Sequence, residues 1–508
     1  MKLFSFNKIV TSIILCIILF SSCISYHKSN YTFNQKYSAA ELKEDFLLLK
    51  KILEVNHPSL YWFTPKDSVE YYFTITINSI TDSLTEAQCR NKIAFVLSKI
   101  RCGHTGVRYS KDFDRLVKTE RGAAFPLSIK TWKDSMVVVA SAFKKDSIFK
   151  RGTIITSIDG RTNKEILDSI FQFISTDGYA DNFKSQVVSN NFSGWYRNVF
   201  GLKNKYSIKY TDSAGKESLA TVYNFIPKKD TVKRKDTSIV IIQSIAPQLS
   251  KRQLKLLSKR SMNIDSTINT AYIRLTTFSG YRLRKFFRQS FRTIHQQQIK
   301  NVVIDLRENL GGDVDKSILL AKYLKDSSFK VADTIAAMSR KFEYGKYIRS
   351  GFWDWFPMHF TNKKMGDGRI HNHYLETHYY HPKQNNHFSG NIYLVQGGYT
   401  FSAATMFLSW MKGQQNVQLI GEETGGGYYG NSAMFIPDIV LPNTKLRVSL
   451  PLYRVVWNDK RIKNGRGVMP DIEIDPSSQA IKNGVDIKLN YIRKMIVKTN
   501  KKSSIPIQ

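Results

Sequence analysis

The second half of the chain repeats one pattern, in which a short apolar strand is followed by a glycine-bearing loop and then a helix. Residues 301–307 (NVVIDLR) are almost continuously apolar and precede a helix predicted over 314–324. The pattern returns with a strand at 391–395 and a helix that begins near Ser402, and a third strand covers 417–420. Such runs are typical of parallel strands buried on both faces. The repeat therefore predicts right-handed β–α–β units in an α/β fold.

The preceding residues have a different character. Ser38 and Glu41 form a capping box that opens a helical region. Residues 122–226 change to short β-type runs, and residues 227–237 are charged and poor in apolar residues, as in a linker. At 508 residues the chain has room for two to four domains. We predict a helical region at 38–115, a β-rich domain at 116–230, an α/β core at 231–488 and a basic tail at 489–508.

The charge balance is strongly basic, with 76 Lys and Arg against 41 Asp and Glu, a net charge of +35. A nucleic acid, an acidic substrate or an anionic membrane surface would all suit this charge. The basic residues are spread along every segment, however, without an arginine-rich arm or a nucleic-acid-binding motif. We therefore interpret the charge as a solvated basic surface and expect no nucleic-acid partner.

The N-terminus has the pattern of a secretory signal. Two lysines precede a twelve-residue apolar run at 9–20, which is too short to span a bilayer. Ser21, Ser22 and Cys23 follow, so that residues 19–23 (LFSSC) resemble a bacterial lipobox. That resemblance implies a signal peptide at 1–22, acylation of Cys23, a tether at 23–37 and a lipid-anchored, periplasm-facing protein, with the outer membrane as the expected location.

Ser402 is the first candidate for chemistry, because it lies between a strand and a helix. A serine there often serves only as a helix N-cap. It can also be a nucleophile, since the helix N-terminus and nearby amides stabilise developing negative charge. The loop at 305–312 (DLRENLGG) leaves a neighbouring strand. It is either a simple turn or a loop whose amides point at a bound carbonyl.

Five motifs occur in order along the core: VVIDLRENLGG (302–312), GGYTFSAATMF (397–407), IGEETGGG (420–427), LPNT (441–444) and GRGVMPDIEI (465–474). Together they resemble the C-terminal-processing, or tail-specific, serine peptidases. The resemblance covers most of residues 38–476, including RCGHT at 101–105 and a PDZ-like segment at 149–160. It implies a Clp-protease/crotonase-like core, a PDZ-like domain that adds a peptide to an open sheet edge, Ser402 as nucleophile and an oxyanion hole. The hole would use the amide of Ala403 and that of Gly311 or Gly312.

The resemblance also bears on the general base. One branch of the family uses a lysine in the loop that here reads TGGG at 424–427, without a lysine. The tricorn-like branch uses a histidine from a Gly-His-Thr segment, which His104 matches. Neutral imidazole can accept the serine proton, with a titration expected near pH 6–7. That branch completes the site with a glutamate, where this chain has Asn464. Glu422 and Glu423 are alternative carboxylates.

A histidine-rich insertion separates two core strands, with His359, His371, His373, His378, His381 and His387 in thirty residues. His371, His373 and Glu376 have zinc-ligand chemistry. The segment is equally rich in aromatic residues, and we interpret it as a lid or a substrate-facing wall, with no metal and no cofactor.

The sequence thus predicts a membrane-anchored serine peptidase that hydrolyses polypeptides near their C-termini, in an unspecified oligomeric state. One alternative is a catalytically weakened relative that binds peptides or hydrophobic ligands, which Asn464 favours. Another is an envelope scaffold that works through its PDZ-like unit. Labelling by a fluorophosphonate separates them, because only an activated serine reacts.

Overall fold

The computed structural model describes residues 30–120, 122–212, 215–227, 249–349, 361–457 and 460–503. The predicted signal peptide and Cys23 lie outside these residues. In the described part of the chain no helix is both long and apolar enough to cross a membrane.

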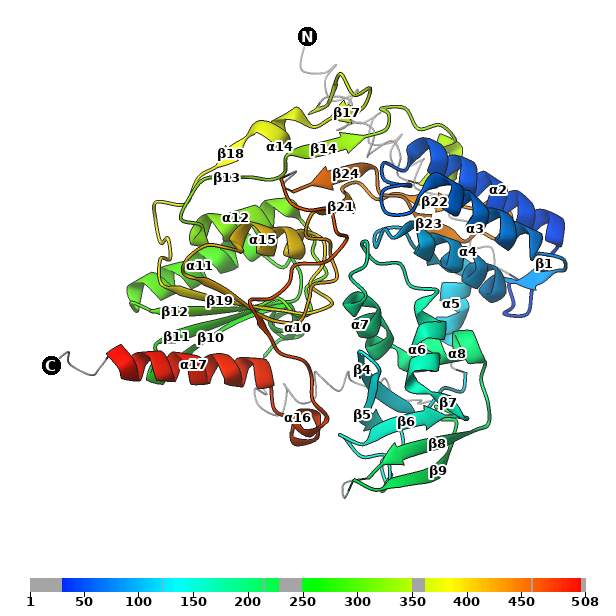
Figure 1. Ribbon diagram of the computed structural model, residues 1–508, viewed down its shortest axis with the longest axis horizontal. Coiled ribbons are helices and arrows are strands. Elements are labelled where there is room, and N and C mark those ends of the chain that lie inside the picture. Colours follow the sequence, from blue (N-terminus) through cyan, green and yellow to red (C-terminus); the bar gives the residue numbers. More distant parts are fainter. Residues whose placement is uncertain are drawn as a thin grey trace, which may run out of the picture.

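A six-stranded sheet forms the centre of the C-terminal half, as Figure 1 shows. Its order is β10 (Arg260–Asp265), β11 (Thr270–Leu275), β12 (Asn301–Asp305), β19 (Asn391–Gln396), β20 (Val417–Gly421) and β25 (Ile472–Glu473). All neighbours are parallel except the edge pair β10–β11. The predicted β–α–β units are therefore confirmed.

Helices cover both faces of this sheet, which explains the continuous apolar strands. On one face, Val302 and Ile304 pack in the main core with helices α11 (Leu283–Gln296), α12 (Val314–Leu324) and α15 (Ala403–Met411). On the other face, Val303 packs with Ile492 and Ile496 of helix α17 (Ile487–Ser503). Part of the predicted basic tail is thus a helix that covers the sheet, because its apolar side needs a partner.

The N-terminal region contains α2 (Ala39–Asn56), α3 (Lys66–Asn78) and α4 (Glu86–Ile100), and the predicted capping box at Ser38 and Glu41 is present. The fully buried Asp45 of α2 accepts hydrogen bonds from the amides of Asn443 and Thr444 and from the Thr444 hydroxyl. The LPNT motif therefore holds the N-terminal helices against the hairpin of β22 (Asp438–Val440) and β23 (Arg447–Ser449).

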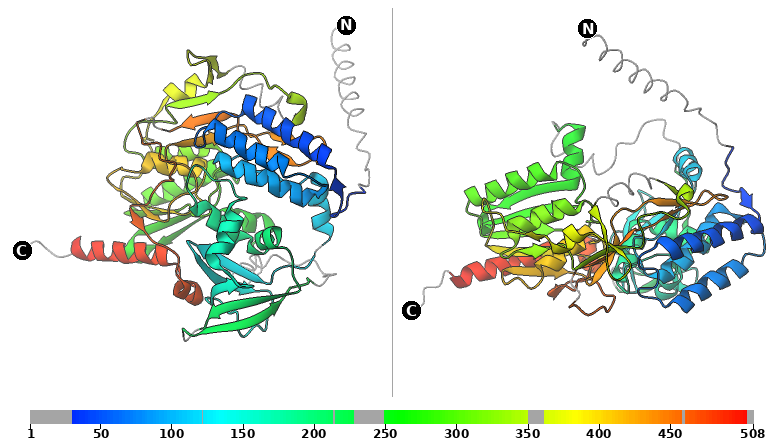
Figure 2. Two further views of the ribbon diagram at one scale, coloured as in Figure 1. Left: turned by 45° about the vertical axis from the view of Figure 1, so that its right-hand side comes forward. Right: turned by 90° about the horizontal axis from the view of Figure 1, so that it is seen from above.

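This hairpin belongs to one of two further sheets between the helices and the core (Figure 2). The first has the order β15 (Ile348–Arg349), β22, β23 and β3 (Val107–Arg108). The second has the order β16 (Lys363–Lys364), β17 (Ile370–His371), β14 (Thr334–Ala337), β24 (Tyr453–Val456) and β21 (Gly430–Ala433). Short pairs also join β1 (Lys36–Tyr37) to β2 (Leu84–Thr85) and β13 (Phe329–Lys330) to β18 (Tyr379–Tyr380).

The β-rich unit has a hydrophobic core of its own. Its antiparallel sheet has the order β4 (Leu127–Trp132), β5 (Ser135–Ser141), β6 (Ile154–Ile158), β8 (Lys205–Thr211) and β9 (Glu217–Tyr223), with β7 (Arg161–Thr162) beside β6. Helices α6 (Asn163–Phe171), α7 (Asn182–Asn190) and α8 (Phe192–Phe200) accompany it.

The sheet edge at β4 has one backbone amide that is already paired. Helix α7 packs along it, and the amide of Thr131 donates to Ser189 Oγ of that helix at 2.8 Å. A peptide added as a strand beside β4 would therefore find no free amide at Thr131.

The other α-helices among the described residues are short. They are α5 (Lys111–Thr119), α10 (Lys251–Lys259), α14 (His373–Thr377) and α16 (Ser478–Asn483).

Candidate active site

Ser402 lies at the N-terminus of α15 in an unusual backbone conformation. Its φ is 53° and its ψ is −125°, a region that side-chain-bearing residues rarely adopt. Its hydroxyl makes no capping hydrogen bond to the helix. The N-cap explanation for this serine is therefore not supported, and the backbone strain is of the kind that proteins retain at functional positions.

The loop after β12 lies directly against this serine. A Cβ added to Gly311 would lie 2.7 Å from Ser402 Cβ and 2.9 Å from the amide nitrogen of Ala403. The amide of Phe401 donates to the carbonyl oxygen of Asn309 at 3.0 Å. Only glycine fits at position 311, where φ is +98°, so this approach of the two loops requires the Gly-Gly pair.

The same contacts distinguish the candidate oxyanion donors. The Gly311 amide already donates to Asn309 Oδ1 at 2.9 Å, and the Gly311 carbonyl oxygen accepts from the amide of Phe278. The amides of Gly312 and Ala403 have no hydrogen-bond acceptor among the described residues. Of the two alternatives, Gly312 is thus the glycine whose amide is available, together with Ala403.

The glycine loop after β20 closes the other side of the serine segment. The amides of Gly425 and Gly426 both donate to the carbonyl oxygen of Thr400. A Cβ at Gly425 would overlap the Gly398 carbonyl oxygen, and one at Gly426 would overlap Thr405 Oγ1. A lysine has no room at either position, which agrees with the absence of a lysine from this loop.

His104 lies on the loop between α4 and β3, and the structure brings it to the serine segment. Its ring packs on the ring of Phe401, with the centroids 4.8 Å apart, and Phe401 in turn stacks on Phe183 of α7. A Cβ on Gly103 would lie 2.5 Å from the Phe401 ring. No hydrogen bond joins His104 to Ser402 in the described part of the chain, so the two are neighbours through Phe401.

Burial changes the protonation of this histidine. The ring is half-buried, and its Nδ1 is enclosed without a hydrogen-bond partner among the described residues. Burial lowers the pKa of His104 to about 4, because the charged imidazolium is poorly solvated there. The free enzyme should therefore hold His104 neutral well below the pH range of 6–7 expected from the sequence.

Asp177, which the sequence analysis did not single out, connects the histidine loop to the glycine loop. This carboxylate is almost fully buried and accepts from the amide of Gly103 at 2.8 Å and from that of Gly427 at 3.4 Å. Burial raises its pKa to about 7. The only sequence signal here is an Asp-Gly pair typical of a turn, which does not indicate a catalytic site.

The residues after Asp177 continue this connection. The amide of Gly178 donates to the carbonyl oxygen of Arg101, and the amide of Tyr179 donates to that of Gly465. Three predicted segments, RCGHT, TGGG and the loop at 465, thus meet at residues 177–179.

Asn464 lies next to this meeting point, but its side chain does not reach His104. It is exposed, and its Oδ1 accepts from the amide of Arg466 within its own turn. A short Asx-type turn thus satisfies that side chain locally. A catalytic role for Asn464 therefore has no contact to support it in this structure.

The alternative carboxylates are also engaged. Glu423 accepts from the amide of Gly467 at 2.7 Å and pairs with Arg466. Glu422 is buried and pairs with Lys488 of α17. Both therefore hold the core together and neither contacts His104.

The histidine-rich insertion has other partners. His371 lies between Glu376 and Asp367, His381 contacts Ser328, and His387 contacts the carbonyl oxygen of Lys325. His359 lies outside the described residues. Within those that are described, no group of three side chains has the arrangement of a metal site.

The comparisons with known proteins agree with this geometry. Residues 269–474 match the model of peptidase family S41. No curated protein sequence matches the chain. Among solved structures, mature CPAF matches with a TM-score of 0.61 at 15% identity, over 92% of this chain and 99% of that one. CPAF in complex with lactacystin gives 0.59 at 14% identity, over 90% and 98% of the two chains.

The structural likeness extends far beyond the residues of the family model, so the N-terminal helices and the β-rich unit are part of the shared fold. The serine at the strand–helix junction, the Gly-Gly loop against it and the family match lead to one conclusion. Residues 269–474 are similar to peptidase family S41, a family of serine peptidases that act on proteins.

Proposed function

We propose that this protein is a lipid-anchored serine peptidase of the cell envelope in which Ser402 is the nucleophile and His104 the general base. The observation that carries the proposal is the strained Ser402, packed between the Gly-Gly loop and the TGGG loop, with the His104 ring against the neighbouring Phe401. Polypeptides are the substrate class, and cleavage near their C-termini follows from the family resemblance alone.

The reaction would proceed in two steps. Ser402 Oγ attacks the scissile carbonyl carbon while His104 accepts its proton, and the amides of Ala403 and Gly312 stabilise the oxyanion. His104 then returns the proton to the leaving amine, and water hydrolyses the acyl-enzyme. In the structure His104 contacts Phe401 rather than Ser402, so the mechanism requires the imidazole to reach the Ser402 hydroxyl when substrate binds.

A fluorophosphonate probe tests this proposal directly. Wild-type protein should become covalently labelled at Ser402, whereas Ser402→Ala should not, and His104→Ala should label much more slowly. Lactacystin, which CPAF binds, is a second probe for the same position. Absence of labelling in the wild type over hours would exclude an activated serine.

The second candidate is a peptide-binding protein with weakened catalysis. It is favoured by the exposed Asn464, which is occupied in its own turn, and by the unpartnered Nδ1 of His104. Peptide binding without labelling of Ser402 would support this candidate instead.

The location is a separate part of the proposal. Cys23 follows a short apolar run, as in lipoproteins of the bacterial envelope. Cys23→Ser should move the protein from the membrane fraction to the soluble fraction. Membrane fractionation that persists, with no lipid mass on Cys23, would contradict acylation.

A further inference from the structure

The imidazole of His104 has few contacts of its own that hold it in place. Its Nδ1 has no hydrogen-bond partner among the described residues, and its ring packs on the ring of Phe401. The position of the ring therefore depends on the backbone of its loop, residues 101–105, which we call the base loop. This backbone is tightly enclosed at Gly103, where an added Cβ would lie 2.5 Å from the Phe401 ring and 3.2 Å from the amide nitrogen of Asp177.

The Asp177 carboxylate joins the base loop to the glycine loop after β20. One of its oxygens accepts from the amide of Gly103 at 2.8 Å, and the other accepts from the amide of Gly427 at 3.4 Å. The glycine loop in turn holds the Ser402 segment, because two of its amides donate to the carbonyl oxygen of Thr400. A continuous run of hydrogen-bonded loops thus connects the base loop to the nucleophile, and one carboxylate closes it.

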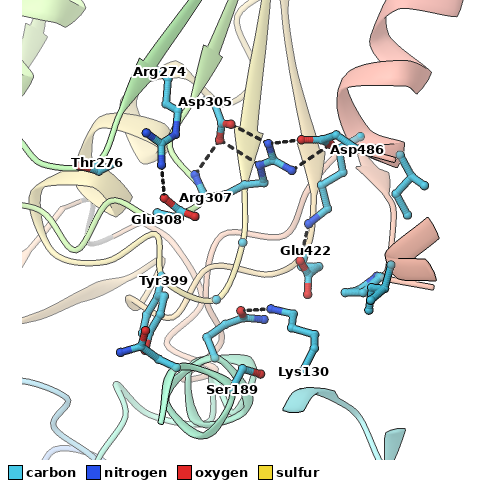
Figure 3. Close-up of a pocket in the computed structure, with 18 of the residues that line it drawn as sticks. Lys130, Ser189, Arg274, Thr276, Asp305, Arg307, Glu308, Tyr399, Glu422 and Asp486 are labelled. Carbon is cyan, nitrogen blue, oxygen red and sulfur yellow. Dashed lines mark hydrogen bonds and ion pairs between the residues drawn. The ribbon is translucent and has the colours of Figure 1, made fainter. Parts of the chain in front are cut away.

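Carboxylates elsewhere in the protein have cations beside them. In the cavity between the core sheet and the β-rich unit, Figure 3 shows Arg307 between Asp305 and Asp486, with an ion pair to each. Asp177 is only 2% exposed, yet no cation pairs with it in the part of the chain that the structure describes. Its partners are backbone amides on two different loops.

A buried carboxylate without a cation is costly to keep ionised. Burial accordingly raises the pKa of Asp177 to about 7. Carboxylates shifted in this way are concentrated at functional sites, where their cost is offset by what they do. Both amides need an acceptor at the same time, and only the ionised group offers free lone pairs on both oxygens without carrying a proton on one of them.

The carboxylates that the sequence indicated have other partners. Glu422 pairs with Lys488, and Glu423 accepts from the amide of Gly467. Asp177, in contrast, is bound to the residue that directly precedes His104.

We infer that Asp177 is a positioning residue for the proposed general base, because its carboxylate holds the base loop at the place from which His104 serves Ser402. It acts on the imidazole through the backbone of Gly103 and has no contact with the substrate in this role. The inference rests on the proposed function, since it assigns a residue to the Ser402–His104 pair.

The rate of covalent labelling of Ser402 by a fluorophosphonate tests this role. At pH 8.5, above the raised pKa of Asp177, the wild-type carboxylate is ionised. Asp177→Asn keeps an acceptor for one loop but turns a donor toward the amide of the other. We expect it to label roughly tenfold more slowly than wild type, the scale of one disrupted buried hydrogen bond.

A double-mutant cycle separates positioning from a general loss of stability. In the His104→Ala background the base is absent, so Asp177→Asn should change the slow residual labelling by less than about twofold. A purely structural role would lower the rate by the same factor in both backgrounds. Thr176→Val is the matched control, because it removes the buried hydrogen bond from Thr176 Oγ1 to the Ala180 carbonyl oxygen in the same turn. It should label at the wild-type rate.

Asp177→Ser is the second variant, in case Asp177→Asn does not fold. Its side chain is smaller than the native one and offers a single oxygen, so it should show the same slow labelling. Circular dichroism verifies that each variant is folded.

Three results would overturn the positioning role: wild-type labelling by a folded Asp177 variant, an equal loss in the His104→Ala background, or failure of both variants to fold. Failure of the proposed function looks different. Wild-type protein that does not label, or His104→Ala that labels as fast as wild type, would contradict the nucleophile or the base itself. Slow labelling by His104→Ala together with fast labelling by Asp177→Asn would leave a serine peptidase whose base is positioned without Asp177.

Discussion

The Ser402 segment and the His104 segment lie next to each other, yet different parts of the molecule hold each of them in place. Ser402 is held by loops of the parallel sheet, through Asn309, Thr400 and the glycines at 425 and 426, and its neighbour Phe401 stacks on Phe183 of α7. The His104 loop is held by Asp177 from the neighbourhood of the β-rich unit and by Phe401 of the core.

A third contact supports the histidine side. Thr105 Oγ1 lies 2.8 Å from Nε2 of His57, a buried histidine whose pKa burial lowers to about 3. The backbone hydrogen bonds of the nucleophile segment thus come from the core, whereas the position of the base depends on how several parts of the chain assemble. The histidine side is therefore the one that depends on how the domains pack together.

The largest effect is expected on the serine side. Ser402→Ala should reduce hydrolysis by roughly 1,000-fold or more, because it removes the nucleophile. Folding should be nearly unchanged, since the hydroxyl makes no capping bond. Peptide turnover and the thermal midpoint of the same preparation measure both quantities.

Ser402→Gly is the matched control for backbone strain. It should be equally inactive but more stable than Ser402→Ala by about 1 kcal/mol, since glycine tolerates a positive φ. A Ser402→Gly protein that is less stable than Ser402→Ala would contradict the strain.

On the histidine side, His104→Ala should lower kcat/KM by roughly 100-fold to 10,000-fold, the usual range for a general base. The wild-type protein should keep His104 neutral down to about pH 4, so its kcat/KM should show no histidine ionisation between pH 6 and 7. A pH–rate profile of wild type checks this. A clear rise centred near pH 6.5 that disappears in the variant would show that the imidazole is more solvated than the structure indicates.

Asp177→Asn should change how stability depends on pH. Asp177 has a pKa raised to about 7 in the folded protein, against about 3.9 for a free Asp, so the folded state retains a proton that the unfolded state loses between these values. This residue therefore makes wild type less stable as pH rises from about 4 to 7, and its effect is constant above that range.

The measurement is the difference in thermal midpoint between Asp177→Asn and wild type at pH 4.5 and pH 7.5. The difference should shift in favour of the variant at the higher pH. Asp181→Asn, an exposed residue close by in sequence, is the control and should show no such shift. A pH-independent difference for Asp177→Asn would mean that the carboxylate is already ionised at pH 4.5.

The smallest effect is expected for Asn464, whose side chain serves its own turn. Asn464→Ala should change kcat/KM by less than about threefold, because surface substitutions away from special contacts have small effects. Asn464→Glu should be just as mild. A gain of tenfold or more for Asn464→Glu would show that this position reaches the imidazole during catalysis, and would restore its predicted role.

The amino-acid sequence determined the parallel sheet, the helix after each strand and the position of Ser402 at the start of a helix. These features leave local patterns in the sequence: the apolar strand at 301–305, the Gly-Gly pair and the apolar helix that begins at Ala403. Local hydrophobic pattern and glycine placement carry that information, so it can be read without knowing the rest of the fold.

Tertiary structure alone decided which residues surround His104. Asp177 lies 73 positions from His104 in the sequence. Glu423 and Asn464 were both candidates from the sequence, yet Glu423 accepts from the amide of Gly467 and Asn464 from that of Arg466. It also decided that α7 packs against β4, and that Lys130 and Gln186 are hydrogen-bonded to each other. Such pairings depend on side-chain packing between distant segments, and no periodicity in the sequence encodes which buried donor is left without a partner.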